Sequence, residues 1–166
     1  MPAQGEGLPR VPPAFVNEVA SAGVRAVIPV IVTAWLSTYD WWNNSPPGAG
    51  ISYAKDYGYP TIHDQAGGSG TYKNPITFAS ASGELRPGTH IYIPWLHKYF
   101  MKEDDCASCS SSPSWQFDLW VGGVSRAQNR DQSPSDIVNL WQRETVVIYP
   151  AGNKRVNTTL LARVKI

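Results

Sequence analysis

The feature that most constrains this chain is a series of short runs of β-branched and aromatic residues separated by turn-forming residues. Such runs are too short and too β-branched to favour helices, and glycine and proline between them are the residues that turns require. The sequence has 14 glycines and 14 prolines, enough to separate many short strands. We therefore expect an all-β protein with the strands of a barrel or a sandwich.

The strands can be placed from this pattern. The first, residues 24–35, is rich in valine and isoleucine and is expected to cross the core. The last two, residues 145–150 and 158–166, are expected to form a closing hairpin. Between them the sequence predicts strands over residues 76–79, 89–94, 98–103 and 116–121.

The length of 166 residues suits one barrel domain, which we expect over residues 24–166. Residues 1–23 are expected to form an N-terminal extension that ends in a short helix. Pro13 suits the first turn of this helix and Gly23 its C-terminal cap.

The charge balance excludes several kinds of partner. A net charge of +1 gives no basic surface for a nucleic-acid backbone, so no nucleic acid is expected. The apolar stretch over residues 24–36 is interrupted by Pro29 and Thr33 and is too short for a membrane span. We expect a monomer that needs no cofactor and is not bound to a membrane.

The N-terminus and the two cysteines bear on whether the protein is cytosolic or secreted. The first seven residues have neither the basic nor the apolar region of a signal peptide, so the protein is either cytosolic or begins at a mature N-terminus with an added Met1. Cys106 and Cys109 are too few for a structural zinc site, and their serine-rich surroundings favour a disulfide that closes a small loop. We favour the second alternative, a secreted protein.

Two features that could suggest ligand sites have simpler explanations. The glycine-rich residues 67–71 lack the Gly-Lys-Ser/Thr ending of a phosphate-binding loop and are expected to form a tight loop with positive φ angles. His63, His90 and His97 are scattered along the chain, and no metal site is expected from them.

Aspartates are the candidate catalytic groups. Asp118 lies within an apolar strand, where a carboxyl group must be hydrogen-bonded, raised in pKa or directed into a cleft, unless it faces solvent. Asp40 follows a strand and is a second candidate. The acidic residues 103–105 are expected to form a solvated turn.

The order of these motifs resembles the double-psi β-barrel proteins of cell walls, which include rare lipoprotein A, expansins, barwin-like proteins and family 45 endoglucanases. The similarity extends from Thr33 to Gly123. It implies a six-stranded double-psi β-barrel with long loops. The motifs that carry it are Thr33-Ala34-Trp35, Thr38-Tyr39-Asp40, Ile76-Thr77-Phe78-Ala79, Arg86-Pro87-Gly88-Thr89-His90-Ile91-Tyr92-Ile93 and Phe117-Asp118-Leu119.

The resemblance also implies catalytic roles. Asp118 matches the aspartate that acts as general acid in the family 45 enzymes, and Asp40 matches their general base, although here the paired cysteines after it are missing. Inverting hydrolysis needs two carboxyl groups roughly 6.5 to 9.5 Å apart. A lytic reaction would use Asp118 alone, with internal attack by the sugar. Both chemistries stay open at this point.

Aromatic residues are the candidate contacts to sugar rings, because sugars present apolar faces that stack on them. Trp35 and Trp120 are assigned mainly to the core. The adjacent Trp41 and Trp42 precede a polar loop and cannot easily both be buried, so they are the best candidates for a ligand platform. The predicted substrate-binding residues are Tyr39, Trp41, Trp42, Tyr53, Trp95 and Trp115.

These observations lead to one main functional hypothesis and two alternatives. The main hypothesis is a secreted protein that cleaves a cell-wall polysaccharide by aspartate general acid/base chemistry. The first alternative is an expansin-like or barwin-like protein that binds polysaccharide without cleaving it. The second is a protease inhibitor. Fold alone does not decide among them.

Overall fold

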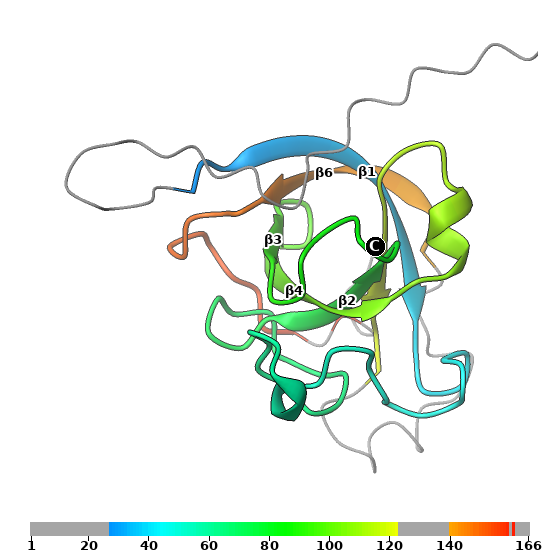
Figure 1. Cartoon of the computed structure of the whole chain (residues 1–166). Helices are drawn as coiled ribbons and strands as arrows, with labels where there is room; N and C mark the ends of the chain where they lie inside the picture. The colour runs from blue at the N-terminus through cyan, green and yellow to red at the C-terminus, as the bar shows by residue number, and fades with distance from the viewer. Residues whose placement is uncertain (1–26, 123–139, 160, 162–166) are drawn as a thin grey trace, which may run out of the picture.

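Six strands close into a barrel in the computed structural model, which describes residues 27–122, 140–159 and 161 (Figure 1). Two short 3-10 turns, η1 (Lys55–Tyr57) and η2 (Ser108–Ser111), lie in the connecting loops. The described part of the chain contains no α-helix. The strands are β1 (Val30–Tyr39), β2 (Ile76–Ser80), β3 (His90–Ile93), β4 (Lys98–Asp105), β5 (Gln116–Trp120) and β6 (Gln142–Ile148).

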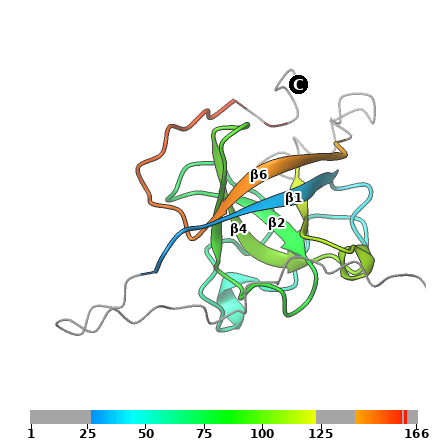
Figure 2. The ribbon, with the colours of Figure 1, turned by 90° about the horizontal axis from the view of Figure 1, so that it is seen from above.

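The strands do not follow one another around the barrel in sequence order. Their order is β1-β5-β2-β4-β3-β6, with β6 closing onto β1. The pairs β1/β5 and β2/β4 are parallel, and the other four pairs are antiparallel. The view from above shows β1 and β6 side by side (Figure 2). A parallel pair requires a long crossover, which explains the long loops between strands.

The barrel encloses a closely packed apolar core to which every strand contributes. Side chains alternate between the two faces of a strand, so one face of each strand supplies this core. Burying one such side chain stabilises the fold by about 1.5 to 3 kcal/mol. The core residues with no solvent exposure are Ala34, Leu36, Phe78, Ile91, Ile93, Phe100, Phe117, Leu119, Val146 and Ile148.

The all-β prediction is confirmed, and five expected strands lie close to β2, β3, β4, β5 and β6. The first strand is displaced, since it was expected over residues 24–35 and β1 occupies Val30–Tyr39. Pairing with both β5 and β6 extends it beyond its β-branched part. The expected short helix over residues 13–23 lies outside the described residues.

The predicted closing hairpin does not appear in the described residues, and most of its second strand, residues 160 and 162–166, lies outside them. Thr158 and Thr159 are not in a strand, and β6 pairs instead with β1 and β3. Lys98 holds the segment that contains these threonines, because its ammonium group donates hydrogen bonds to the carbonyl oxygens of Asn157 and Thr159. A buried side chain therefore anchors this segment where backbone pairing was expected.

The prediction for the glycine-rich loop is confirmed. Gly68 has a φ of +110°, and a Cβ atom there would lie 2.0 Å from the carbonyl oxygen of Pro75. Only glycine fits such a close backbone approach. The loop therefore serves the path of the chain into β2.

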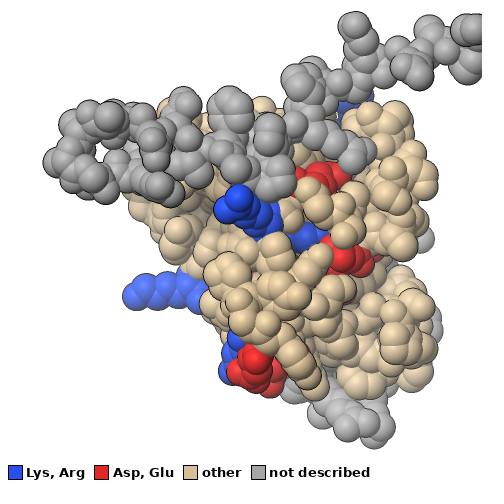
Figure 3. Space-filling view, in the orientation of Figure 1, with Lys and Arg blue, Asp and Glu red and all other residues tan. Residues whose placement is uncertain are grey.

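The surface carries few charges, as the low charged fraction of the sequence implies. On the face shown in Figure 3, the basic and acidic side chains are sparse and scattered among uncharged ones. Among the residues described, no helix is both long enough and apolar enough to span a membrane.

Candidate functional site

Asp118 lies on the outer face of β5. Its neighbours Phe117 and Leu119 are fully buried in the core, so the alternation of the strand directs Asp118 away from it. The carboxyl group is half-buried, and the Ser37 hydroxyl on β1 donates a hydrogen bond to it at 2.9 Å. The parallel register places these two residues directly side by side.

Burial raises the pKa of Asp118 to about 6. The hydrogen bond from Ser37 lowers the pKa, because it stabilises the charged form of Asp118. The nearby charge of Asp104 raises the pKa further. A carboxyl group with this pKa can donate and recover a proton near neutral pH. Of the alternatives that the sequence left open for Asp118, the structure shows two together, a hydrogen bond and a raised pKa.

Asp104 is the carboxyl group whose charge acts on Asp118. It is 6% exposed and accepts hydrogen bonds from the Tyr39 hydroxyl at 3.1 Å and from the Ser52 hydroxyl and N–H at 2.8 and 3.0 Å. Burial, followed by the charges of Asp104 and Asp118, raises the pKa of Tyr39 well above its usual value. Tyr39 therefore stays protonated as a donor to Asp104.

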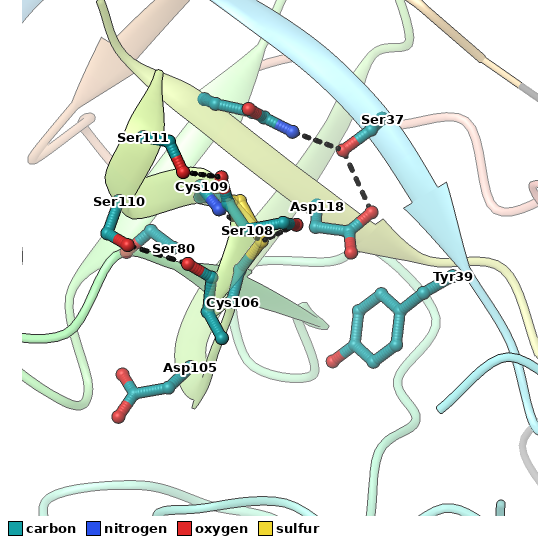
Figure 4. The surroundings of a disulfide bond; sticks show 12 residues. Ser37, Tyr39, Ser80, Asp105, Cys106, Ser108, Cys109, Ser110, Ser111 and Asp118 are labelled. Atoms are coloured by element: carbon teal, nitrogen blue, oxygen red, sulfur yellow. Dashed lines mark hydrogen bonds between the residues drawn. A yellow bond between two sulfur atoms is a disulfide. The ribbon is translucent and has the colours of Figure 1, made fainter. Parts of the chain in front are cut away.

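The disulfide between Cys106 and Cys109, confirmed in the structure, closes the loop beside this cluster. The Cys106 N–H donates to the Ser80 carbonyl at the end of β2, and turn η2 packs against β5. Figure 4 shows the disulfide loop, Ser37, Tyr39 and Asp118 in one region of the molecule. The loop thus supports the strand that carries Asp118.

Asp40 occupies a different environment from Asp118. It is 3% exposed, and its Oδ1 accepts the backbone N–H groups of Trp42 and Asn43 at 2.6 and 3.0 Å. These bonds hold the turn that follows β1. The structure brings Asp118 together with Asp104 and Ser37, and it gives Asp40 a role in shaping the backbone of that turn.

The predicted aromatic contacts divide into exposed and buried residues. Trp42 is 51% exposed and Trp95 36% exposed, and Trp41 and Tyr53 are half-buried. Trp115 is 2% exposed in the core, so its prediction as a surface contact is corrected; it packs near Phe117. Tyr39 is also buried, and its hydroxyl is used by Asp104 rather than offered to solvent.

Sequence reasoning missed an aromatic platform formed by Trp35 and Trp141. The two indole rings stack with their centroids 4.9 Å apart and an interplanar angle of 15°. Trp141 is 59% exposed, and the guanidinium of Arg143 lies 5.9 Å from the centroid of the Trp35 ring. The assignment of Trp35 mainly to the core overlooked this half-exposed face.

The register of three neighbouring strands places the platform beside Asp118. Trp35 pairs with Arg143 on β6, and Ser37 pairs with Asp118 on β5. Extending the β1/β6 register by one residue sets Trp141 beside Ser37. Because neighbouring strands lie about 4.8 Å apart, the backbone positions of Trp141 and Asp118 are separated by about 10 Å across β1. We call Trp35, Trp141, Arg143, Ser37 and Asp118 the outer-face site.

The acidic residues after Lys102 are not a solvated turn, as was expected, but the end of β4. Glu103 is fully buried and accepts four hydrogen bonds, from the N–H groups of Ile62 and His63, the His63 ring and the Thr77 hydroxyl. A bulge between Phe78 and Ala79 accommodates it. Glu103 thereby ties the long loop before β2 to the barrel.

The described residues contain no group of three or more His, Cys, Asp or Glu side chains that could hold a metal ion. Both ring nitrogens of His63 are used within the protein, Nδ1 by Glu103 at 2.7 Å and Nε2 by Asn74 at 2.8 Å. A serine triad that used this histidine would have to break both bonds. The outer-face site is therefore the strongest candidate for chemistry.

Comparison with known proteins gives a relative and a family. The chain is 38% identical over 95 residues to a Dictyostelium discoideum protein named uncharacterized protein DDB_G0273701/DDB_G0273221. The matched part is 55% of this chain and 40% of the relative, so the chain spans less than half of that protein. No solved structure matches. The model of the DDB_G0273701 N-terminal domain family matches residues 31–165, which include β2 to β6, all of β1 except its first residue, and the outer-face site. The chain therefore belongs to this family.

Proposed function

We propose that this protein is a secreted carbohydrate-active protein that binds a cell-wall polysaccharide across the outer face of β6, β1 and β5 and cleaves it with Asp118 as general acid. The observation that carries the proposal is the position of Asp118, a carboxyl group with a pKa of about 6, in register with Ser37 and the Trp141 end of an exposed tryptophan stack.

The connectivity of the barrel supports the double-psi type within this proposal. Two parallel pairs, β1/β5 and β2/β4, are each completed by a long crossover, and the antiparallel pairing of β2 with β5 joins them into one closed barrel. This arrangement fits the motif order that resembles cell-wall proteins. The disulfide supports secretion, because such bonds persist mainly in oxidising compartments.

The surroundings of the carboxyl groups favour a reaction with one acid over a reaction with two. Both oxygens of Asp104 and the Oδ1 atom of Asp40 accept hydrogen bonds from the protein, and both side chains are nearly buried. Their burial disfavours a role for either in activating a water molecule from solvent. Asp118 is the half-exposed carboxyl group beside the aromatic platform.

A lytic reaction fits a single acid. Asp118 donates its proton to the glycosidic oxygen as the C1–O bond breaks, and a hydroxyl group of the same sugar forms the new bond to C1. The proton of that hydroxyl returns to Asp118, so atoms and charge balance without an external nucleophile. One product then carries an internal anhydro bond and is lighter by one water than the hydrolytic product.

The proposal is tested by the products that purified protein releases from peptidoglycan, cellulose, β-glucan and chitin. Mass spectrometry should find anhydro-ended fragments from one of these polymers. Asp118→Asn, which keeps the shape of the side chain but lacks the proton, should reduce release by about 10²- to 10⁴-fold while binding persists. Full activity in this variant would contradict the catalytic role.

Asp118→Asn also separates the first alternative from the main proposal. A protein that binds one polymer in a pull-down assay but releases no fragments, in wild type and variant alike, would be a non-catalytic binding protein of the expansin-like kind. Exposed tryptophans support that alternative as well, because stacking needs no proton transfer.

A further inference from the structure

A basic side chain lies on the aromatic platform beside Asp118, and its positive charge favours a negatively charged ligand at the outer-face site. Arg143 is exposed at the second position of β6, with its guanidinium 5.9 Å from the centroid of the Trp35 ring. Guanidinium groups stack on indoles and keep their N–H donors free at the edge. Arg143 is therefore held on the same surface on which a sugar ring would stack.

The neighbouring acidic residue does not neutralise this charge. Glu144 follows Arg143 directly, but the register pairs it with the fully buried Ala34, so it belongs to the opposite face of the strand. Its carboxyl group accepts from the Gln142 side chain at 2.5 Å. In the part of the chain that the structure describes, Arg143 forms no ion pair.

On the described strands β6, β1 and β5, the carboxyl group that shares this face with Arg143 is that of Asp118, two strands away. Strand spacing puts the backbone positions of Arg143 and Asp118 about 12 Å apart, with Trp35 and Ser37 between them. A carboxyl group that is protonated at mildly acidic pH does not repel an anionic ligand. The face thus presents, in order, a fixed positive charge, an aromatic surface and a proton donor.

We propose that the outer-face site selects an acidic polysaccharide, in which a carboxylate on one sugar residue pairs with Arg143 while the ring stacks on the Trp35–Trp141 platform. This inference rests on the proposed function, since it names the substrate class of the same site. A planar, bidentate pair between the Arg143 guanidinium and a carboxylate attracts the ligand and also orients it. The pair would thereby determine which sugar residue of the polymer lies next to Asp118.

The test uses polymers that share a backbone and differ in charge. Binding of the full chain is measured for polygalacturonate against its methyl ester, and for carboxymethylcellulose against hydroxyethylcellulose. Wild type should bind the acidic member of at least one pair about five-fold more tightly, and salt should weaken that binding. Arg143→Gln should remove the difference and keep the affinity for the neutral polymer.

Two control variants isolate the position of the charge. Arg143→Lys keeps the charge on the platform and should keep a preference for the acidic polymer. Lys154→Gln removes one exposed positive charge from the loop after β6 and should change nothing. Equal effects of Arg143→Gln and Lys154→Gln would show a response to net charge alone and would overturn the inference.

Failure of the inference can be told apart from failure of the proposed function. If wild type binds the neutral and acidic members equally and Arg143→Gln leaves both affinities unchanged, the acidic selectivity is wrong while polysaccharide binding stands. If wild type binds neither member of either pair and none of the polymers in the cleavage assay, both proposals are wrong.

Discussion

At the scale of single residues, three influences set the pKa of Asp118: burial, the hydrogen bond from Ser37 and the charge of Asp104. Burial raises it to about 6, the charge of Asp104 raises it, and the Ser37 hydroxyl lowers it. A hydrogen bond to a charged group contributes about 1.5 to 3 kcal/mol, and one pKa unit corresponds to about 1.4 kcal/mol. Loss of the Ser37 hydroxyl should therefore change the pKa of Asp118 measurably.

Ser37→Ala is expected to raise the pKa of Asp118 by about one unit, because the charged form loses its donor. In the proposed reaction Asp118 acts in its protonated form, so the decline of the cleavage rate on the alkaline side should move to higher pH by the same amount. Carboxyl carbon shifts in an NMR titration measure the pKa directly. Thr145→Ala, at an exposed position of β6, serves as the control and should leave both profiles unchanged.

At the scale of elements, the pair of the partly exposed His63 and the buried Glu103 attaches the loop before β2 to the end of β4. Burial lowers the pKa of His63, but the hydrogen bond and charge of Glu103 outweigh it, and the pKa is raised overall. Because the folded-state pKa lies above the unfolded value of about 6.5, the pair stabilises the fold fully below that pH. Its contribution is lost as the pH rises through the folded-state pKa.

The free energy of unfolding of wild type relative to His63→Gln should therefore decrease between pH 6 and pH 8. Comparing the two proteins at each pH cancels the opposite effect of His90, whose pKa burial lowers. Glu103→Gln should destabilise by about 3 kcal/mol at pH 6, because it removes the buried charged partner of His63. Denaturant titration measures both; a wild-type advantage that grows with pH would contradict the assignment of the pair.

The same element shows what local sequence could and could not predict. The strand from Lys98 was placed correctly, because aromatic residues such as Tyr99 and Phe100 favour strands. Its acidic end was expected in solvent, since three adjacent carboxyl groups repel one another. The donors that satisfy Glu103 come from residues 62, 63 and 77, far away in sequence, and the bulge that admits it is not encoded in local composition.

At the scale of the whole molecule, the outer-face site depends on the order of the strands around the barrel. β1 lies between β5 and β6, so Trp35 meets Trp141, and Ser37 meets Asp118, although these residues are distant in the sequence. Sequence reasoning identified Asp118 from its apolar strand. It could not identify Trp141, because a tryptophan beside a polar segment gives no indication of its partner until the strand order is known.

The fold of the barrel places some tryptophans in the core and others on the surface, although the sequence around them does not distinguish them. Trp115 packs in the core at 2% exposure, whereas Trp141 is 59% exposed on the platform. Trp115→Ala should therefore destabilise the protein by about 3 to 5 kcal/mol, because it leaves a cavity. Trp141→Ala should lower polysaccharide affinity by about five-fold, the loss of one stacking surface, and change stability by less than about 1 kcal/mol.

Thermal unfolding and polymer binding, measured on the same preparations, distinguish these outcomes. Trp42→Ala provides a matched control, because Trp42 is 51% exposed but lies in the turn held by Asp40 and not on the outer-face site. If Trp42→Ala weakens binding and Trp141→Ala does not, the ligand surface lies at the turn after β1, and Asp118 loses its adjacent platform. If Trp141→Ala alone weakens binding, the result supports the proposed path of the polysaccharide across β1, between the tryptophan stack and Asp118.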